Sequence, residues 1–337
     1  MGSERNTLVG TPVVIAPGKL FLIGEYAVLD GGPAVLAAVN RYASAQFMPG
    51  MNPLSKLVGE SVARAKAEIG EAAAALPPGS VLVDTEDFQQ GGQKIGLGSS
   101  AAAAVAATGA LFECAGMSVE QHRERIHTVA RTAHHTVQGG RGSGADVAVA
   151  VHGGLIRFER LKTGGASVQP LTAPSGLRIV VFWTGGSAST ISMIEGIERL
   201  AKAKPSVYKE IIGSLREIAF RFIEEMHAGS ATGAVAAAGR YAKRLAVLGE
   251  AASLPIVTEP FTRASELARE LGGAAKPSGA GGGDIGIAMF ATPESARLFA
   301  RALPKPLTPL DVDLDRLGVR RRTPHEPEAE ASELFHV

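Results

Sequence analysis

Residues 94–116, with the sequence KIGLGSSAAAAVAATGALFECAG, restrict the possible folds more than any other stretch of the chain. Glycine and serine residues lead directly into an alanine-rich segment, which predicts a helix that is capped by serine and ends at Gly116. Apolar residues make up 45% of the chain and aromatic residues only 5%, a composition that favours many helices packed closely on a sheet. The glycine-rich start is therefore either a plain turn before this helix or a loop that holds an anion.

The length and charge of the chain limit its organisation and its partners. A chain of 337 residues is long for one core, so we expect two domains, at residues 1–180 and 181–337. The 34 Lys and Arg residues nearly balance the 33 Asp and Glu residues, so we expect no nucleic-acid partner and no membrane binding. The single cysteine, Cys114, is expected in the core and excludes a disulfide within the chain. With no signal-peptide pattern at the N-terminus, a cytoplasmic protein is expected.

Hydrophobic patterns and turn residues predict the order of the elements. Strands are expected on both sides of Pro17-Gly18, within residues 11–29, and at 80–88, 146–160, 177–186 and 285–290. Helices are expected at 54–76, 99–116, 118–138, through most of 190–272 and at 293–303, the third of them starting at a capping box of Ser118 and Gln121. The tail from Arg320 is charged and poor in apolar residues, so at least part of it is expected to be disordered.

Glycine-dense loops interrupt these elements at residues 94–101, 139–146 and 277–284. A single loop of this kind is more often simple turn chemistry than ligand contact, but serine beside glycine in all of them favours ligand contact. The segment GLGSSA formally matches a dinucleotide-binding fingerprint, yet the nearest predicted strand ends near Phe88, too early for that motif. The P-loop pattern is absent from the sequence.

The first loop has the chemistry of a phosphate site. Backbone N–H groups of Gly96 to Ser100 can converge on one point, with the positive end of the following helix behind them. Ser99 and Ser100 can cap that helix, bind Mg²⁺ through a hydroxyl, or do one each. Elsewhere Asp146, expected at the start of a strand, needs a cation if it points inward, and Lys19 is the natural candidate.

Taken together, the segments APGKLFLIGEYAVLDGG, KIGLGSSAAAA and KPSGAGGGDIGIAMF resemble the motifs of the GHMP kinase superfamily, in the family's order and over nearly the whole chain. Within that superfamily, the segment AHHTVQGGRGSGADV is most similar to phosphomevalonate kinases. The resemblance implies an α+β fold of two domains, an N-terminal one like ribosomal protein S5 domain 2 and a ferredoxin-like C-terminal one. It also implies ATP and Mg²⁺ as cofactors, 5-phosphomevalonate as the substrate and a monomer or homodimer.

The resemblance further assigns roles to individual residues. Lys19 and Asp146 would lie at the reacting centre, and Ser100 would assist Mg²⁺. ATP would lie on the first loop, which comprises Lys94, Gly96, Leu97, Gly98, Ser99, Ser100 and Ala101. The third loop would close under the phosphates and comprises Ser278, Gly279, Ala280, Gly281, Gly282, Gly283 and Asp284. Facing the acceptor would be Lys94, Ser143, Gly144, Ser187, Ser189 and Thr190, with Arg141 either a further cation on the acceptor or a solvated loop residue.

One position departs from the related mevalonate kinases, in which a glutamate that helps to hold Mg²⁺ stands eleven residues before the reacting aspartate. His135 occupies that position here, and an imidazole is a poor ligand for a hard cation. The two histidines at 134 and 135 are otherwise a packed or solvated pair on a helix. Three alternatives stay open: a mevalonate kinase, a mevalonate diphosphate decarboxylase of the same superfamily, and a binding protein without catalytic activity.

Overall fold

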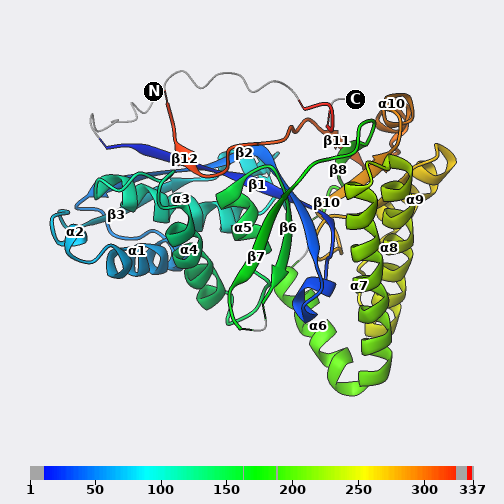
Figure 1. Cartoon of the computed structure of the whole chain (residues 1–337), viewed down its shortest axis with the longest axis horizontal. Coiled ribbons are helices and arrows are strands. Elements are labelled where there is room, and N and C mark those ends of the chain that lie inside the picture. Colours follow the sequence, from blue (N-terminus) through cyan, green and yellow to red (C-terminus); the bar gives the residue numbers. More distant parts are fainter. Residues whose placement is uncertain (1–10, 162, 187–188, 324–331, 336–337) are drawn as a thin grey trace.

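Two domains built around separate sheets make up the part of the chain that the computed structural model describes, residues 11–161, 163–186, 189–323 and 332–335 (Figure 1). The first sheet has six strands, and its order begins at a strand from the C-terminal end of the chain. Across the sheet lie β12 (Arg320–Arg321), β1 (Val13–Ile23), β2 (Ala34–Pro49), β6 (Leu155–Arg160) and β7 (Ala166–Leu171), with β3 (Gly79–Asp84) also paired to β2.

The second sheet has four antiparallel strands and its own cluster of buried phenylalanine side chains. Its order is β11 (Thr308–Leu310), β8 (Arg178–Trp183), β10 (Ile285–Phe290) and β9 (Ala274–Pro277). The rings of Phe290 and Phe299 lie 5.2 Å apart at the centre of this cluster. A short hairpin of β4 (Gln89–Gln90) and β5 (Gln93–Lys94) turns through Gly91 and Gly92, both with positive φ, and so presents Lys94 beside the first glycine loop.

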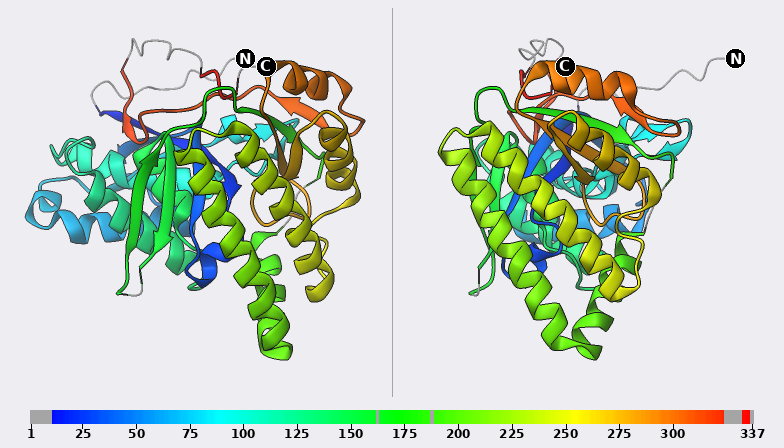
Figure 2. Two further views of the ribbon diagram at one scale, coloured as in Figure 1. Left: turned by 45° about the vertical axis from the view of Figure 1, so that its right-hand side comes forward. Right: turned by 90° about the vertical axis from the view of Figure 1, so that its right-hand side faces the viewer.

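The helices cover the sheets in two groups. The first domain contains the short helices η1 (Ala27–Asp30), α2 (Glu71–Ala74) and η2 (Glu86–Phe88), together with α1 (Lys56–Ile69), α3 (Ser99–Cys114), α4 (Arg123–Val137) and α5 (Ala145–His152). The second contains α6 (Thr190–Ala203), α7 (Pro205–His227), α8 (Ala231–Ala252), α9 (Glu259–Glu270) and α10 (Pro293–Ala302). Figure 2 shows α7 and α8 as a long pair beside the second sheet. Among the described residues, no helix is both long enough and apolar enough to span a bilayer.

Helix α3 is the centre of the first domain. It packs on β1, β2, α1, α4 and α5, and the side chains from Ala101 to Phe112 are buried on every face. Small side chains permit this close approach. A methyl group on Gly109 would stand 2.9 Å from a methyl of Val14 on β1. The alanine-rich composition is therefore what allows a helix to be surrounded by other elements.

Four sequence predictions of local structure are wrong, one of them the serine cap of α3, whose N-cap is Gly98. The expected turn at Pro17-Gly18 is a bulge within the continuous strand β1, where the pairing with β2 shifts register. The run VAVAV, expected as a strand, lies in the helix α5, because it is buried on all sides and a run of that length has no decisive period. Helix α4 begins at Arg123 without the capping box, since the Ser118 hydroxyl donates to Glu120 instead.

Other expectations agree with the structure or are left open by it. The helices at 54–76, through 190–272 and at 293–303 are present, and Cys114 is partly buried against the core. The division at residue 180 stays a prediction: β8 lies in the second sheet, whereas β12 returns to the first. Of the tail from Arg320, the first residues form β12, and 324–331 and 336–337 lie outside the described residues.

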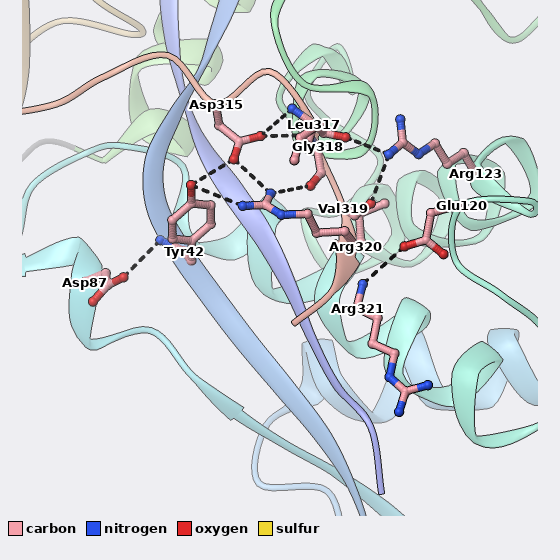
Figure 3. Close-up of polar contacts among 10 residues, drawn as sticks. All are labelled: Tyr42, Asp87, Glu120, Arg123, Asp315, Leu317, Gly318, Val319, Arg320 and Arg321. Carbon is pink, nitrogen blue, oxygen red and sulfur yellow. Dashed lines mark hydrogen bonds and ion pairs between the residues drawn. The ribbon is translucent and has the colours of Figure 1, made fainter. Parts of the chain in front are cut away.

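A polar network fastens the returning C-terminal segment to the first domain (Figure 3). The buried carboxylate of Asp315 accepts hydrogen bonds from the backbone of Leu317 and Gly318, from the Tyr42 hydroxyl at 2.8 Å and from the Arg320 guanidinium at 2.8 Å. Arg123 of α4 donates to the carbonyl groups of Leu317 and Val319. Burial, followed by the charge of Asp315, raises the pKa of Tyr42 to about 12, so the hydroxyl stays a donor at neutral pH.

We expect Asp315→Asn to lower the free energy of unfolding by about 2 to 4 kcal/mol, because it removes a buried carboxylate charge that pairs with the half-buried Arg320 guanidinium and accepts several hydrogen bonds. Urea denaturation followed by circular dichroism measures this. The exposed Asp311, on the same segment, gives the matched control Asp311→Asn, which should change stability by less than about 0.5 kcal/mol. Equal effects of the two substitutions would contradict the role given to the network.

Candidate active site

A cleft of about 790 Å³ is lined by residues of both domains. The first domain contributes β1, the loop at 93–100 and the loop at 138–146, and the second contributes residues near 185–194 and the loop at 278–284. The three glycine-dense loops thus meet at one cavity. Hydrogen bonds from β1 to two of these loops, at Leu97 and Ser278, join segments that lie far apart in the sequence.

Lys19 of β1 projects into this cleft and is fixed at several points. Its backbone N–H donates to the Leu97 carbonyl at 2.8 Å, and its ammonium group donates to the Gly96 carbonyl at 3.3 Å. The aliphatic part of the side chain lies across Gly98, where a methyl group would stand 2.8 Å from Lys19 Cγ. Glycine at position 98 is therefore required both by this contact and by its φ of +85°.

Burial and the neighbouring acidic groups have opposite effects on the pKa of Lys19. Burial lowers its pKa, and the nearby charge of Lys276 lowers it further, while Asp146, Asp284 and Glu25 raise it. The half-buried cation thus lies among acidic groups and is held in place, so an anion that enters the cleft finds a preoriented partner.

The start of α3 faces the cleft without a side-chain cap. Its N-cap is Gly98, in the left-handed conformation, and no side-chain hydrogen bond closes the helix start. The expected serine cap is therefore wrong: Ser99 and Ser100 are the first residues of the helix itself. A long helix whose first turn has no side-chain cap offers its N–H groups and the positive end of its dipole to an anion.

Ser100, His134 and Asp146 form a linked group beside this helix start. The Ser100 hydroxyl lies 3.0 Å from His134 Nε2, which also lies 3.2 Å from the Gln138 amide nitrogen, and His134 Nδ1 lies 4.0 Å from an Asp146 carboxylate oxygen. If His134 is neutral with its proton on Nδ1, then Nε2 accepts from Ser100 and the lone pairs of that hydroxyl oxygen stay available. His134 is 3% exposed and therefore fixed.

The histidine at this position corrects the sequence interpretation. Counting eleven residues back from Asp146 selected His135, but His135 is exposed on α4, and His134 is the residue that contacts the site. The shape of the loop between α4 and α5 determines which histidine faces the cleft, and counting residues along the chain takes no account of that shape. The segment AHHTVQGG contained the correct signal, because His134 and Gln138 are one helical turn apart.

Asp146 reaches the cleft from the first turn of α5, not from a strand. One of its oxygens accepts from the N–H of the next residue, Val147, at 2.9 Å. The N-cap of the helix is Gly144, which is left-handed and has the Arg131 side chain lying against it. Asp146 thus lines the cleft, but from a helix and not from the expected strand.

The loop at 278–284 joins the second domain to β1. The Phe21 N–H donates to the Ser278 hydroxyl at 2.9 Å, and the Tyr26 hydroxyl donates to the Ala280 carbonyl. Asp284 packs against Gly96, where a methyl group would lie 2.5 Å from Asp284 Cβ. Tyr26 and Asp284 both have positive φ, which is costly for residues other than glycine and marks the junction as strained.

A buried ion pair below the cleft was not anticipated from the sequence. Lys276 of β9 is 1% exposed and donates to a Glu25 carboxylate oxygen and, at 2.9 Å, to the Pro277 carbonyl. The Tyr241 hydroxyl donates to the Glu25 carbonyl at 2.7 Å, while Glu25 Oε2 has no hydrogen-bond partner among the described residues. Burial raises the pKa of Glu25 and lowers that of Lys276. No sequence spacing links the two residues, so only the fold reveals the pair.

The remaining predicted residues divide into those that line the cleft and those that support it. The cleft is lined by Lys19, Lys94, Gly96, Gly98, Ser99, Ser100, Ser143, Asp146, Thr190, Ser278, Gly279, Ala280, Gly281, Gly283 and Asp284. Outside the lining lie Leu97, Ala101, Gly144, Gly282 and Ser189, whose hydroxyl accepts from Ser192 at the start of α6. Ser187 lies outside the described residues.

Arg141 lines the cleft and also contacts α6. Its guanidinium lies 3.3 Å from a Glu195 carboxylate oxygen and 3.7 Å from one of Glu198. Glu25, Tyr26, Gln138 and Ile191 are further lining residues that the sequence did not single out.

Comparisons with known proteins agree with this architecture. The family model described as the GHMP kinases N terminal domain matches residues 60–154, and the one described as GHMP kinases C terminal matches residues 222–308. A phosphomevalonate kinase from Streptomyces sp. (strain CL190) is 28% identical over 87% of this chain and 96% of its own length. A mevalonate kinase from Thermococcus gammatolerans is 30% identical over 60% of this chain and 66% of its own.

Among solved structures, the Streptococcus pneumoniae phosphomevalonate kinase in complex with phosphomevalonate and AMPPNP superimposes with a TM-score of 0.78 at 22% identity, covering 90% of this chain and 99% of that one. This likeness shows a common two-domain fold. The two family models, taken together, span just over half of the sequence. The chain therefore belongs to the GHMP kinase family.

Proposed function

We propose that this chain is a phosphomevalonate kinase, which transfers the γ-phosphoryl group of ATP to the phosphate of 5-phosphomevalonate and forms 5-diphosphomevalonate. The observation that carries the proposal is the meeting of the start of α3 with Lys19 inside one cleft. Among the relatives, the Streptomyces phosphomevalonate kinase aligns over most of both chains, whereas the mevalonate kinase aligns over about two thirds or less. A cytoplasmic location and a monomeric or homodimeric state stay predictions.

The proposed nucleotide site is the loop from Lys94 to Ala101. Phosphate oxygens would accept hydrogen bonds from the N–H groups at the start of α3, while Lys19 provides a fixed positive charge at the same place. The loop at 278–284 would complete the site from the second domain.

The residues present suit Mg²⁺ bound together with the nucleotide. The Ser100 hydroxyl and the Asp146 carboxylate both line the cleft, on either side of the His134 ring, and both are oxygen groups of the kind that Mg²⁺ prefers. When bound, the ion would neutralise phosphate charge and help to align the transferred group.

The chemistry of the acceptor group determines which catalytic groups the protein must provide. A phosphate monoester has a second pKa of about 6, so the attacking oxygen is already mostly an anion at neutral pH. A general base is then nearly redundant, and the main obstacle is repulsion between two phosphate groups. Lys19, with Lys94 at the mouth of the cleft, would reduce that repulsion, while Asp146 would orient the reacting groups.

Three acceptors distinguish the proposal from its rivals. The enzyme would be given ATP and Mg²⁺ with mevalonate, 5-phosphomevalonate or 5-diphosphomevalonate separately, and ADP release and product mass would be measured. We expect turnover only with 5-phosphomevalonate, whose mass should rise by one phosphoryl group. Turnover of mevalonate alone would identify a mevalonate kinase, release of CO₂ a decarboxylase, and no turnover at all a binding protein.

Replacing Lys19 should damage the reaction more than replacing Asp146. Lys19→Met is expected to lower kcat by about 10³-fold, because it removes the fixed charge that stabilises the transferred group. Asp146→Asn should lower it by about 10-fold to 10²-fold, since the acceptor needs little help from a base. Lys209→Met, at an exposed lysine on α7, serves as the control in steady-state kinetics. Complete loss of activity in Asp146→Asn, equal to that of Lys19→Met, would contradict this mechanism.

Gly98→Ala should displace Lys19 and lower kcat/KM for ATP by about 10²-fold, since its methyl group would lie 2.8 Å from Lys19 Cγ. Gly164→Ala, in the turn between β6 and β7 and away from the cleft, is a matched control, because Gly164 has a similar φ of +86° but no atom within 4 Å of the added methyl group. It should change kcat/KM by no more than about twofold. If both variants lost activity equally, backbone strain and not the position of Lys19 would be the cause.

A further inference from the structure

Two histidines and a glutamate gather at the end of α4 and α5 that lies away from the cleft. Glu124 and His127 are one turn apart near the start of α4, and His152 is the last residue of α5. None of them lines the cleft, whereas His134 and Asp146, at the other ends of the same helices, belong to it.

The ligand atoms of this cluster converge. One atom from each residue lies within 4.8 Å of the others, and His152 Nε2 lies 3.8 Å from a Glu124 carboxylate oxygen. The two imidazole rings meet edge to face, with their centroids 5.4 Å apart. A tetrahedral site with metal–ligand bonds of about 2.0–2.1 Å separates its ligands by about 3.3 Å, so a small closing movement would suffice. The Glu124 side chain is 82% exposed and can therefore move toward the two histidines.

Each of the two imidazole rings has a buried nitrogen without a hydrogen-bond partner in the part of the chain that the structure describes. His127 is 7% exposed, and the Nε2 atoms of His127 and His152 have no hydrogen-bond partner among the described residues. Leaving a buried polar atom unpaired is costly, and such atoms in native proteins usually have an unseen partner. Two such atoms in a cluster whose ligand atoms lie within 4.8 Å of one another, together with a carboxylate, point to a shared ligand.

Burial favours the neutral, ligating form of these histidines. Burial, with His152 and Arg131 nearby, lowers the pKa of His127 to about 4. Burial also lowers the pKa of His152, Arg123 adds to this effect and Glu124 opposes it. Arg123 donates to the Leu317 and Val319 carbonyl groups, so its hydrogen bonds are directed toward the C-terminal segment (Figure 3). At neutral pH both imidazoles therefore have a lone pair to offer without losing a proton.

We propose that Glu124, His127 and His152 bind a zinc ion, with water as the fourth ligand. Two imidazole nitrogens and one carboxylate oxygen suit Zn²⁺ and disfavour the hard ions Mg²⁺ and Ca²⁺. The ion would join the start of α4 to the end of α5, the two helices that position His134 and Asp146. Its role is structural, since the ligands lie outside the cleft.

Zinc binding would be measured on the tag-free, full-length protein by calorimetric titration and by metal analysis after dialysis, with thermal unfolding recorded with and without Zn²⁺. We expect one equivalent of tightly bound zinc and a higher unfolding temperature. Co²⁺ in the same site should give the intense visible absorption of low coordination number.

Substitutions of the three proposed ligands test where the zinc ion binds. His127→Gln, His152→Gln and Glu124→Gln should each weaken zinc binding at least about tenfold. Glu124 is exposed, so its variant stays informative if a buried histidine variant folds poorly. The control His227→Gln, at an exposed position at the end of α7, should bind as the parent does, and so should Asp146→Asn, which excludes binding in the cleft. No zinc binding by the parent protein, or equal binding by the cluster variants, would overturn the proposal.

Discussion

The constraint on which the site depends is the contact between the Lys19 side chain and the glycine loop that starts α3. Lys19 can lie flat across Gly98 and reach the Gly96 carbonyl only because Gly98 has no side chain, and the missing side chain of Gly96 leaves room for Asp284. The same absence leaves the N–H groups at the start of α3 open to the cleft. A fixed cation and a helix start thus face one space, and every proposed step of phosphoryl transfer uses that arrangement.

The second domain completes this space and holds it in place. Its loop at 278–284 bonds to β1 through Ser278 and packs Asp284 on Gly96, while the buried pair of Glu25 and Lys276 joins the two domains below. A buried pair of this kind contributes little net stability, but breaking it by removing one partner is strongly unfavourable. It therefore serves as a specific connection that fixes how the domains meet.

Much of the fold and part of the site follow from the sequence. The three glycine loops that the sequence singled out all line one cleft, and the long amphipathic helices were visible from their period. The run VAVAV misled because a short segment buried on all sides has no informative period. His134 and the partnership of Glu25 with Lys276 depend on loop shape and on contacts between distant residues, which no local pattern encodes.

A crystal structure of the protein with a non-hydrolysable ATP analogue and 5-phosphomevalonate would test directly whether Lys19 and the start of α3 hold the nucleotide. We expect phosphate oxygens of the nucleotide within hydrogen-bond distance of the N–H groups of residues 96–100 and of the Lys19 ammonium group. Phosphates bound elsewhere, or a Lys19 side chain turned away from them, would contradict this expectation.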